Sequence, residues 1–302
     1  MAALALVSPV DVTVQAPGLY VMALEDYLAD PAPAPSLNAS LAHILLSQSP
    51  MHAHLAHPRF NPALVREMSD PFDLGTVVHG LVLESDDRIC EVRARDWRTK
   101  AARQVRDAAR KAGQIPLLTA QAEAARTMAE AIDLQVEQFP DNPQNPRPLR
   151  NGLAERVLVW QEGPIWCRAR LDYLHLDFKA AEDLKTTSES AEPAAWSRNL
   201  FERGHDLQAA FHSRGVQVIC GELPEFRFLV AESAPPYALS LIGLDPMALD
   251  FANQRMRAAM DLWAQCLRTD RWPGYPTRPV YAEVPPWIRG RWEERRFLRD
   301  AP

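Results

Sequence analysis

Residues 165–186 read Ile-Trp-Cys-Arg-Ala-Arg-Leu-Asp-Tyr-Leu-His-Leu-Asp-Phe-Lys-Ala-Ala-Glu-Asp-Leu-Lys-Thr, and this stretch decides the fold. Its first part, residues 165–176, and its last part, residues 181–186, have the residue pattern of β-strands. Between them, Asp177-Phe-Lys-Ala180 is typical of a turn. The stretch therefore predicts an antiparallel hairpin.

Two carboxylates and a lysine of this hairpin form a candidate site. Side chains alternate between the faces of a strand, so Asp183 and Lys185 point the same way while Leu184 points into the core. If the two strands pair about the turn, Asp172 lies near Asp183. Hard carboxylate oxygens suit Mg²⁺, and a neighbouring lysine can orient a water or stabilise charge on phosphorus. The pattern indicates phosphodiester hydrolysis, although a turn aspartate with two surface charges would give the same letters.

Other strands and helices are expected on both sides of the hairpin. A helix opens at Ser36, capped by Ser36 or Asn38, and ends at Ser49-Pro50. Further patterns predict helices over 73–84, 119–138, 192–213 (broken or bent near Gly204) and 246–269, and strands over 154–160 and 225–231. This order predicts an α+β fold, with a central mixed β-sheet flanked by helices, a helical N-terminal part and the site at one edge of the sheet.

The chain ends differ in composition from its middle. Residues 1–35 carry five prolines, which predicts a weakly ordered Pro-rich leader. Residues 36–290 are expected to form the functional domain. Residues 291–302 form a basic C-terminal tail.

Charge is unevenly spread along the chain. The 302 residues are 47% hydrophobic and carry a net charge of −6, which argues mildly against a protein that coats nucleic acid. A local positive channel would suffice for an enzyme that passes DNA through it. The basic stretch 97–113 is either a solvated helix face or part of such a path.

Cysteine spacing indicates which cofactors to expect, and the composition of the N-terminus indicates where in the cell the protein is located. The four cysteines are scattered without a C-x-x-C pair, so neither a zinc site nor an iron–sulfur cluster is expected. No Lys or Arg precedes Arg59, and no apolar run reaches the roughly 18 residues that span a bilayer. We therefore expect a soluble, intracellular (cytoplasmic) protein without a membrane partner.

Four segments, in order, resemble the RecE-like branch of the PD-(D/E)xK nucleases, relatives of exodeoxyribonuclease VIII and more distantly of phage lambda exonuclease. They are Ser40-Leu-Ala-His-Ile-Leu-Leu-Ser-Gln-Ser-Pro-Met-His52, Leu74-Gly-Thr-Val-Val-His-Gly-Leu-Val-Leu-Glu84, Trp166-Cys-Arg-Ala-Arg-Leu-Asp172 with Asp183-Leu-Lys-Thr-Thr187, and Gly204-His-Asp-Leu-Gln-Ala-Ala-Phe-His212. Together they span about residues 36–290. The resemblance implies the PD-(D/E)xK nuclease fold.

The resemblance also implies roles for single residues. The metal ligands it implies are His79, Asp172, Asp183 and the backbone carbonyl of Leu184. Its implied catalytic residues are Lys185, together with Asp172, Asp183, Glu155 on the preceding strand and Gln208. Ser49 and His52 in the front-end helix are candidate DNA contacts. Arg168 and Arg170 are further candidates for phosphate contact because they flank the active strand. His205 and His212 stand where the family often has Tyr.

The implied activity is a metal-dependent exonuclease acting on linear double-stranded DNA from 5′ to 3′ in phage-type recombination. Mg²⁺ is the expected cofactor, with Mn²⁺ as an alternative. The resemblance further implies a ring-shaped homo-oligomer working beside a single-strand annealing protein. Two alternatives stay open: a non-catalytic DNA-binding or structural protein that keeps the fold, and a PD-(D/E)xK nuclease of RecB type.

Overall fold

The computed structural model describes residues 14–62, 74–84, 88–143 and 145–299. Within these residues, seven strands form one mixed sheet with the order β1-β5-β6-β7-β8-β9, and β2 pairs with β6. The strands are β1 (Gly18–Tyr20), β2 (Ser36–Leu37), β5 (Gly152–Glu162), β6 (Ile165–His175), β7 (Ala180–Thr187), β8 (Glu225–Glu232) and β9 (Leu239–Gly243). The β7–β8 and β2–β6 pairs are parallel and the other pairs antiparallel, which makes the sheet mixed.

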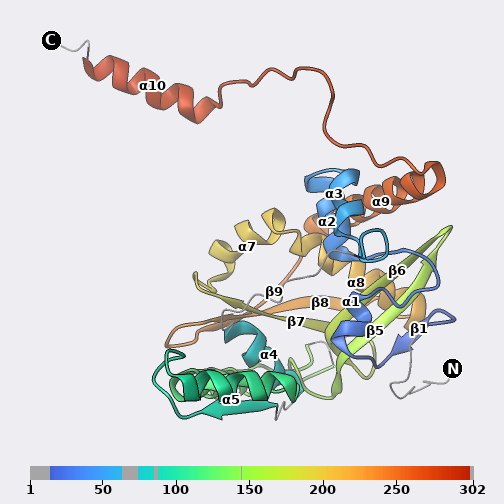
Figure 1. Cartoon of the computed structure of the whole chain (residues 1–302). Coiled ribbons are helices and arrows are strands. Elements are labelled where there is room, and N and C mark those ends of the chain that lie inside the picture. The colour runs from blue at the N-terminus through green and yellow to red at the C-terminus, as the bar shows by residue number, and fades with distance from the viewer. Residues whose placement is uncertain (1–13, 63–73, 85–87, 144, 300–302) are drawn as a thin grey trace.

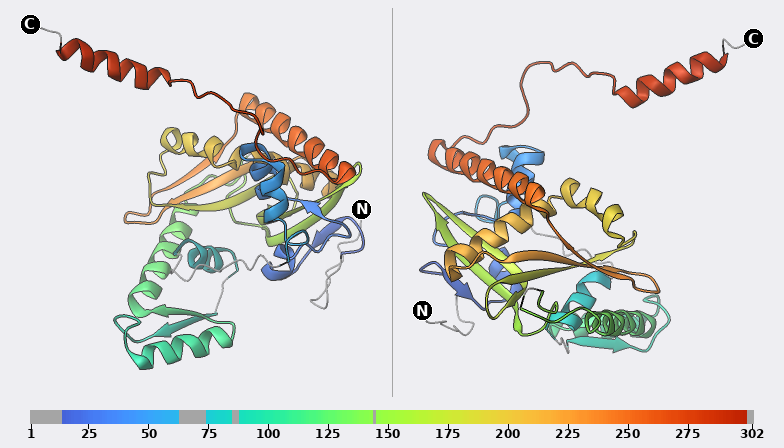
Figure 2. Two further views of the ribbon diagram at one scale, coloured as in Figure 1. Left: turned by 45° about the horizontal axis from the view of Figure 1, so that its top comes forward. Right: turned by 180° about the vertical axis from the view of Figure 1, so that it is seen from behind.

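Helices cover both faces of this sheet (Figures 1 and 2). The helices are α1 (Leu24–Leu28), α2 (Ala39–Ser47), α3 (Pro50–Ala56), α4 (Leu74–Leu83), α5 (Lys100–Lys111), α6 (Thr119–Val136), α7 (Pro193–Glu202), α8 (His205–Cys220), α9 (Pro246–Thr269) and α10 (Pro286–Arg299). Helix α8 packs on β5, β6 and β8, with α2 and α9 outside it, while α4 and α6 pack together below the sheet. A separate pair of parallel strands, β3 (Ile89–Val92) and β4 (Ile115–Leu118), lies beside α5 and α6.

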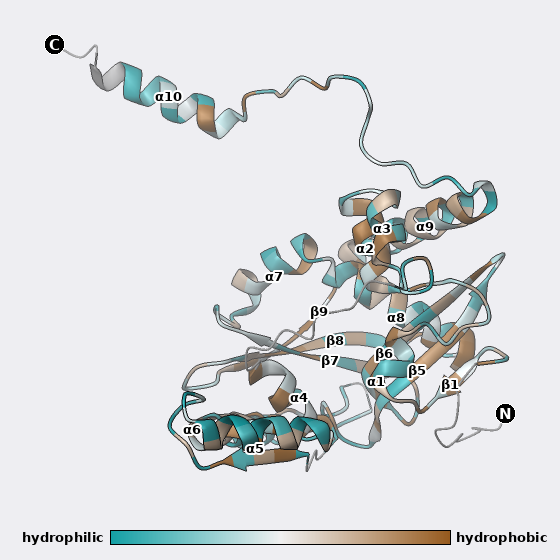
Figure 3. Ribbon diagram, in the orientation of Figure 1, coloured by the Kyte–Doolittle hydropathy of each residue, from teal (hydrophilic) through white to brown (hydrophobic). Residues whose placement is uncertain are grey.

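Two apolar cores hold these layers together. The core on the α8 side includes Trp160, Phe211 and Trp263, each fully buried. The second core joins Val78 of α4 to α6 and to Leu184 of β7, so the predicted inward orientation of Leu184 is confirmed. Figure 3 shows the matching hydropathy, with apolar colour on the central strands and polar colour along α5. The α+β architecture with a central mixed sheet and flanking helices is therefore confirmed.

Local signals explain where the helices begin and end. The Asn38 side chain accepts a hydrogen bond from the Leu41 amide at 2.8 Å, so Asn38 caps α2 and Ser36 belongs to a strand instead. Gly204 has φ +74°, a left-handed conformation that separates α7 from α8 at the predicted break. A Cβ atom at Gly204 would come within 2.3 Å of the His43 ring, so only glycine fits between these elements.

Three predictions about organisation need correction. Residues 14–35 are not weakly ordered: they contain β1 and α1, and Val14, Met22 and Ala32 are buried against β5. The apolar residues between the prolines supply this packing, and residues 1–13 lie outside the described part. The boundary at residue 290 falls inside α10, which stands apart from the body in every view. The hairpin is not at a sheet edge, because β8 and β9 continue the sheet beyond β7.

None of the helices within the described ranges is both long and apolar enough to cross a membrane.

Candidate active site

The site begins where β6 and β7 separate. The two strands pair at Tyr173↔Glu182 and Leu174↔Ala181. Beyond that point the Leu184 amide donates to the Asp172 carboxylate, Oδ2, at 2.8 Å. A side chain thus replaces the backbone acceptor that a continued ladder would supply, and this fixes Asp172 beside β7.

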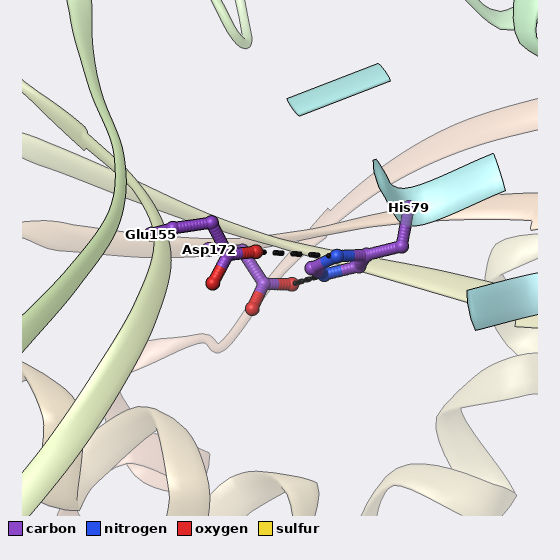
Figure 4. A group of neighbouring side chains, drawn as sticks. All are labelled: His79, Glu155 and Asp172. Atoms are coloured by element: carbon purple, nitrogen blue, oxygen red, sulfur yellow. Dashed lines mark ion pairs between the residues drawn. The ribbon is translucent and has the colours of Figure 1, made fainter. Parts of the chain in front are cut away.

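Helix α4, which lies far upstream of β6 in the sequence, places His79 at this point (Figure 4). Its Nε2 atom lies 2.8 Å from Asp172 Oδ2, and its Nδ1 atom lies 3.2 Å from Glu155 Oε1. One ligand atom from each of these three residues lies within 4.8 Å of the others. Three separate segments of the chain therefore converge on one small group of donors.

Glu155 reaches the group through an unusual backbone conformation. Its φ is +55° although it lies inside β5, between the paired residues Ala154 and Arg156. Non-glycine residues rarely adopt this region, and those that do cluster at functional sites. The conformation puts the Glu155 carboxylate against His79 and Arg170, with Arg170 Nε 2.7 Å from Glu155 Oε2.

Asp183 anchors a second part of the site. Its Oδ1 atom accepts a hydrogen bond from Gln208 of α8 at 2.6 Å, and its Oδ2 atom pairs with Lys185. His205 is hydrogen-bonded to Gln208 and stacks on Trp196, with ring centroids 5.4 Å apart and nearly parallel. Burial and the nearby Lys185 charge lower the pKa of His205 to about 4, so this ring is neutral.

Burial raises the pKa of two of the three carboxyl groups. It raises the pKa of Glu155 to about 7, with Arg170 opposing the shift and Asp172 adding to it. Burial, followed by the negative charge of Asp172, raises the pKa of Asp183 to about 6. A positive charge among these carboxylates would lower both pKa values. The cluster is therefore electrostatically suited to a cation.

Hydrogen bonds and ion pairs decide the charge of the remaining groups. Burial is the largest influence and opposes charge on Asp172, but the hydrogen bond and charge of His79, the charge of Lys185 and the Leu184 amide together outweigh it and lower the pKa of Asp172. Burial likewise opposes charge on Lys185, but Asp183 and then Asp172 raise the pKa of this ammonium above its usual value. Lys185 therefore keeps its proton at neutral pH.

The donor set fits a divalent metal ion. Carboxylate oxygens suit Mg²⁺ and Mn²⁺, and an imidazole nitrogen is a better ligand for a transition metal than for Mg²⁺. His79, Glu155 and Asp172 offer one such nitrogen and two such oxygens.

Comparison with known proteins agrees with this geometry. Residues 44–281 match the family described as "PDDEXK-like domain of unknown function (DUF3799)". The chain belongs to this family.

A crystal structure from Eubacterium rectale, described as that of a "Putative exonuclease", has the same fold as this PDDEXK-like chain. The TM-score is 0.51 at 14% identity, over 86% of this chain and 96% of the other. No curated protein matches the chain.

In this PDDEXK-like chain, two predicted DNA contacts are misplaced. Arg168 is 1% exposed and donates from Nη1 to the Ser36 carbonyl at 2.8 Å, with Asp30 at 3.2 Å, so it cannot reach a phosphate. Ser49 is also buried, and its hydroxyl is hydrogen-bonded to His52 Nδ1 at 2.6 Å. Arg168 is held by the distant Ser36 and Asp30, and Ser49 by the neighbouring His52, so the polar groups of both side chains are turned away from the surface.

The remaining predicted residues lie partly at the site and partly away from it. Arg170 lies at the site through its pair with Glu155. His52 is on α3, with its ring 5.4 Å from Tyr275. His212 is buried against Phe226, and burial lowers the pKa of His212 to about 4, so it is a neutral core residue. The Leu184 carbonyl stays a predicted ligand.

One contact that supports the site was not anticipated. Asp206, next to His205 in the α8 motif, is fully buried and accepts two hydrogen bonds from Arg255 of α9, at 2.7 and 2.6 Å. This pair joins α8, which carries Gln208, to α9. An acid in the first turn of α8 was the available signal, but its partner 49 residues later was not.

Proposed function

We propose that this chain is a divalent-metal-dependent exonuclease that hydrolyses the phosphodiester bonds of linear double-stranded DNA. The observation that carries the proposal is the convergence of His79, Glu155 and Asp172 beside the Asp183–Lys185 pair. Carboxylates and imidazole that can share a metal, next to a protonated lysine, supply the groups that phosphodiester hydrolysis requires. The family match supports a nuclease fold around this site.

Each part of the site has a distinct task in this proposal. His79, Glu155 and Asp172 would hold the ion, which when bound polarises the phosphoryl oxygen and lowers the pKa of a water. Lys185, kept protonated, donates a hydrogen bond to the phosphoryl oxygen or to the attacking water. Asp183 and Gln208 hold Lys185 in place through the chain of contacts described above.

The order of the four sequence motifs supports a RecE-like enzyme within the wider family. We accordingly propose Mg²⁺ as the cofactor, with Mn²⁺ as the alternative, and degradation from 5′ to 3′. We also propose a ring-shaped homo-oligomer, a single-strand annealing protein as partner, and a role in phage-type recombination in the cytoplasm. These properties rest on the resemblance.

A non-catalytic DNA-binding protein is the second candidate. The left-handed backbone conformation of Glu155 argues against this candidate, because a non-catalytic protein has no reason to keep a strained residue at this position. The lack of clustered cysteines separates the chain from those RecB-type nucleases that carry an iron–sulfur cluster.

Linear and covalently closed forms of one plasmid provide the test. With Mg²⁺, the linear form should be degraded to nucleotides and the closed circle should be spared. With EDTA, neither should change. Equal cleavage of both forms would indicate an endonuclease, and no cleavage in Mg²⁺ or Mn²⁺ would favour the non-catalytic candidate.

A further inference from the structure

The most basic surface of the chain lies outside the active site. Residues 93–111, here called the basic arm, carry eight Arg or Lys and two Asp, a net charge of +6 in a chain of −6. The rest of the chain therefore carries −12. A concentration of positive charge this strong, against an acidic background, favours a polyanionic partner.

Helix α5 arranges the charges of the basic arm along one stripe. Lys100, Arg103, Arg106 and Arg110 follow at intervals of three, three and four residues, which places them on one side of an α-helix. The opposite side carries Ala102 and Ala109, both buried, so small residues seat the helix on β3 and β4. Figure 3 shows the resulting polar face running along α5.

Two of these charges have no side-chain partner among the described residues. Arg98 pairs with Asp96, and Arg106 pairs with Asp107 while lying 5.9 Å over the Trp97 ring. Within the described part of the chain, Lys100 and Lys111 have no ion pair or hydrogen bond from their side chains, and both residues are exposed. Positive charges left open to solvent are available to an outside anion.

The basic arm is connected to the helix that carries His79 through β4 and α6. Val77 and Val78 of α4 share one apolar core with Leu117 of β4 and with α6. Helix α5 packs on β3 and β4, these strands pack on α6, and α6 packs on α4. Figure 2 shows α5 at the end of this group that lies away from α4. The shared core couples the position of the arm to the position of His79.

We propose that the basic arm binds the phosphate backbone of duplex DNA outside the active site and holds the substrate during cleavage. The proposal rests on the proposed function. From Lys100 to Lys111 the helix rises by about 16 Å, at about 1.5 Å per residue. One strand of duplex DNA presents a phosphate about every 3.4 Å along its axis, so the stripe spans about five phosphates.

The test removes three charges from the arm and three from a control surface. In the arm variant, Lys100→Gln, Arg103→Gln and Lys111→Gln keep a good helix former at each position. In the control, Arg257→Gln, Arg268→Gln and Arg271→Gln remove the same charge from exposed positions on and just after α9, across the sheet from α5. Thermal unfolding is measured for both, and Kd for a fluorescent 40-base-pair duplex is measured in Ca²⁺ at several salt concentrations.

The arm variant should bind the duplex at least about tenfold more weakly at 0.1 M salt. Its plot of log affinity against log salt should be shallower by about 2.7, which is about 0.9 for each lost phosphate contact. The control variant should match the wild type in both respects. Single-turnover cleavage in Mg²⁺ at saturating DNA should stay within about twofold of wild type in both variants.

Four results would overturn the proposal. If the arm and control variants bound the duplex with the same Kd, only the net charge of the protein would determine its DNA affinity. If the arm variant bound a single strand of the same length more weakly than the wild type does, but bound the duplex equally well, the duplex would be excluded as the ligand. An arm variant slowed at saturating DNA would place the arm in catalysis instead of binding. A wild type that neither binds nor cleaves DNA would overturn the proposed function as well.

Discussion

Glu182 and Asp183 are neighbours on β7, both buried, yet they belong to clusters of opposite character. Glu182 lies between His175, at 2.9 Å, and Arg227, and these three side chains are at most 4% exposed. Asp183 lies beside Lys185 in a cluster with two further carboxyl groups, and the His79 side chain is 28% exposed. One cluster is closed and balanced in charge, whereas the other is acid-rich and open to solvent.

The partners of each cluster explain the difference. Arg227 also donates to Asn145 Oδ1 and to the Pro146 carbonyl, both at 3.0 Å, so the Glu182 cluster fastens the 141–148 loop to the sheet. The Asp183 cluster instead joins α4 and α8 to the sheet through His79 and Gln208, and the pKa values of two of its three carboxyl groups, Asp183 and Glu155, are raised. Similar residue types thus stabilise the fold on one face of β7 and prepare a reaction on the other.

The largest expected effect comes from Asp172. Asp172→Ala should lower single-turnover cleavage by about 10⁴-fold, because it removes a metal ligand and metal activation is worth several kcal/mol. Mn²⁺ binding, followed by calorimetry, should weaken in parallel. Asp177→Ala, in the exposed turn of the same hairpin, should stay within about twofold of wild type. Full activity in Asp172→Ala would remove the open cluster from the reaction.

Matched amide substitutions at the two neighbours separate the clusters by stability. Glu182→Gln should lower the free energy of unfolding by about 3 kcal/mol or more, because Arg227 is then buried without a counter-charge. Asp183→Asn should leave this free energy unchanged or slightly raised in EDTA, because it removes a carboxylate whose charged form is disfavoured. Urea unfolding of both variants measures the difference. Equal losses would mean that the two clusters are alike.

The smallest of the three effects concerns Lys185. Lys185→Ala should lower single-turnover cleavage by about 10²–10³-fold, the usual loss when one preorganised group is removed from a transition state. Metal affinity and DNA affinity in Ca²⁺ should stay near wild type, because Lys185 is proposed to act on the reacting groups and not to hold the metal. Lys179→Ala, at the exposed turn before β7, is the matched control. Wild-type cleavage by Lys185→Ala would refute the role assigned to it.

The sequence predicted elements whose signals are local. Helix α9 runs from Pro246 to Thr269 as expected, because Asp245 caps it and proline suits its first position. The β6–β7 hairpin also formed as predicted, from strand composition and a turn. The placement of His79 beside the hairpin came from motif resemblance alone, since no local pattern relates residue 79 to residue 172.

Features that depend on distant partners were not predictable. Arg168 looked available for DNA, but it is buried by Ser36 and by Asp30, which lies far upstream in the sequence. The short strands β3, β4 and β9 were missed because their pairing, more than their composition, defines them. The separation of β6 from β7 at Asp172 likewise follows from the Leu184 contact and from no signal in the hairpin itself.

The wide spacing of the site along the chain has a consequence for synthesis. The ribosome delivers His79 first, Asp172 and Lys185 about a hundred residues later, and Gln208 after those. Strand β7 cannot pair with β8, its parallel neighbour, until β8 has been synthesised through Glu232. A growing chain therefore cannot assemble the full set of groups until β8 has been made. Under the proposed function, products of translation interrupted before that point should not cleave DNA.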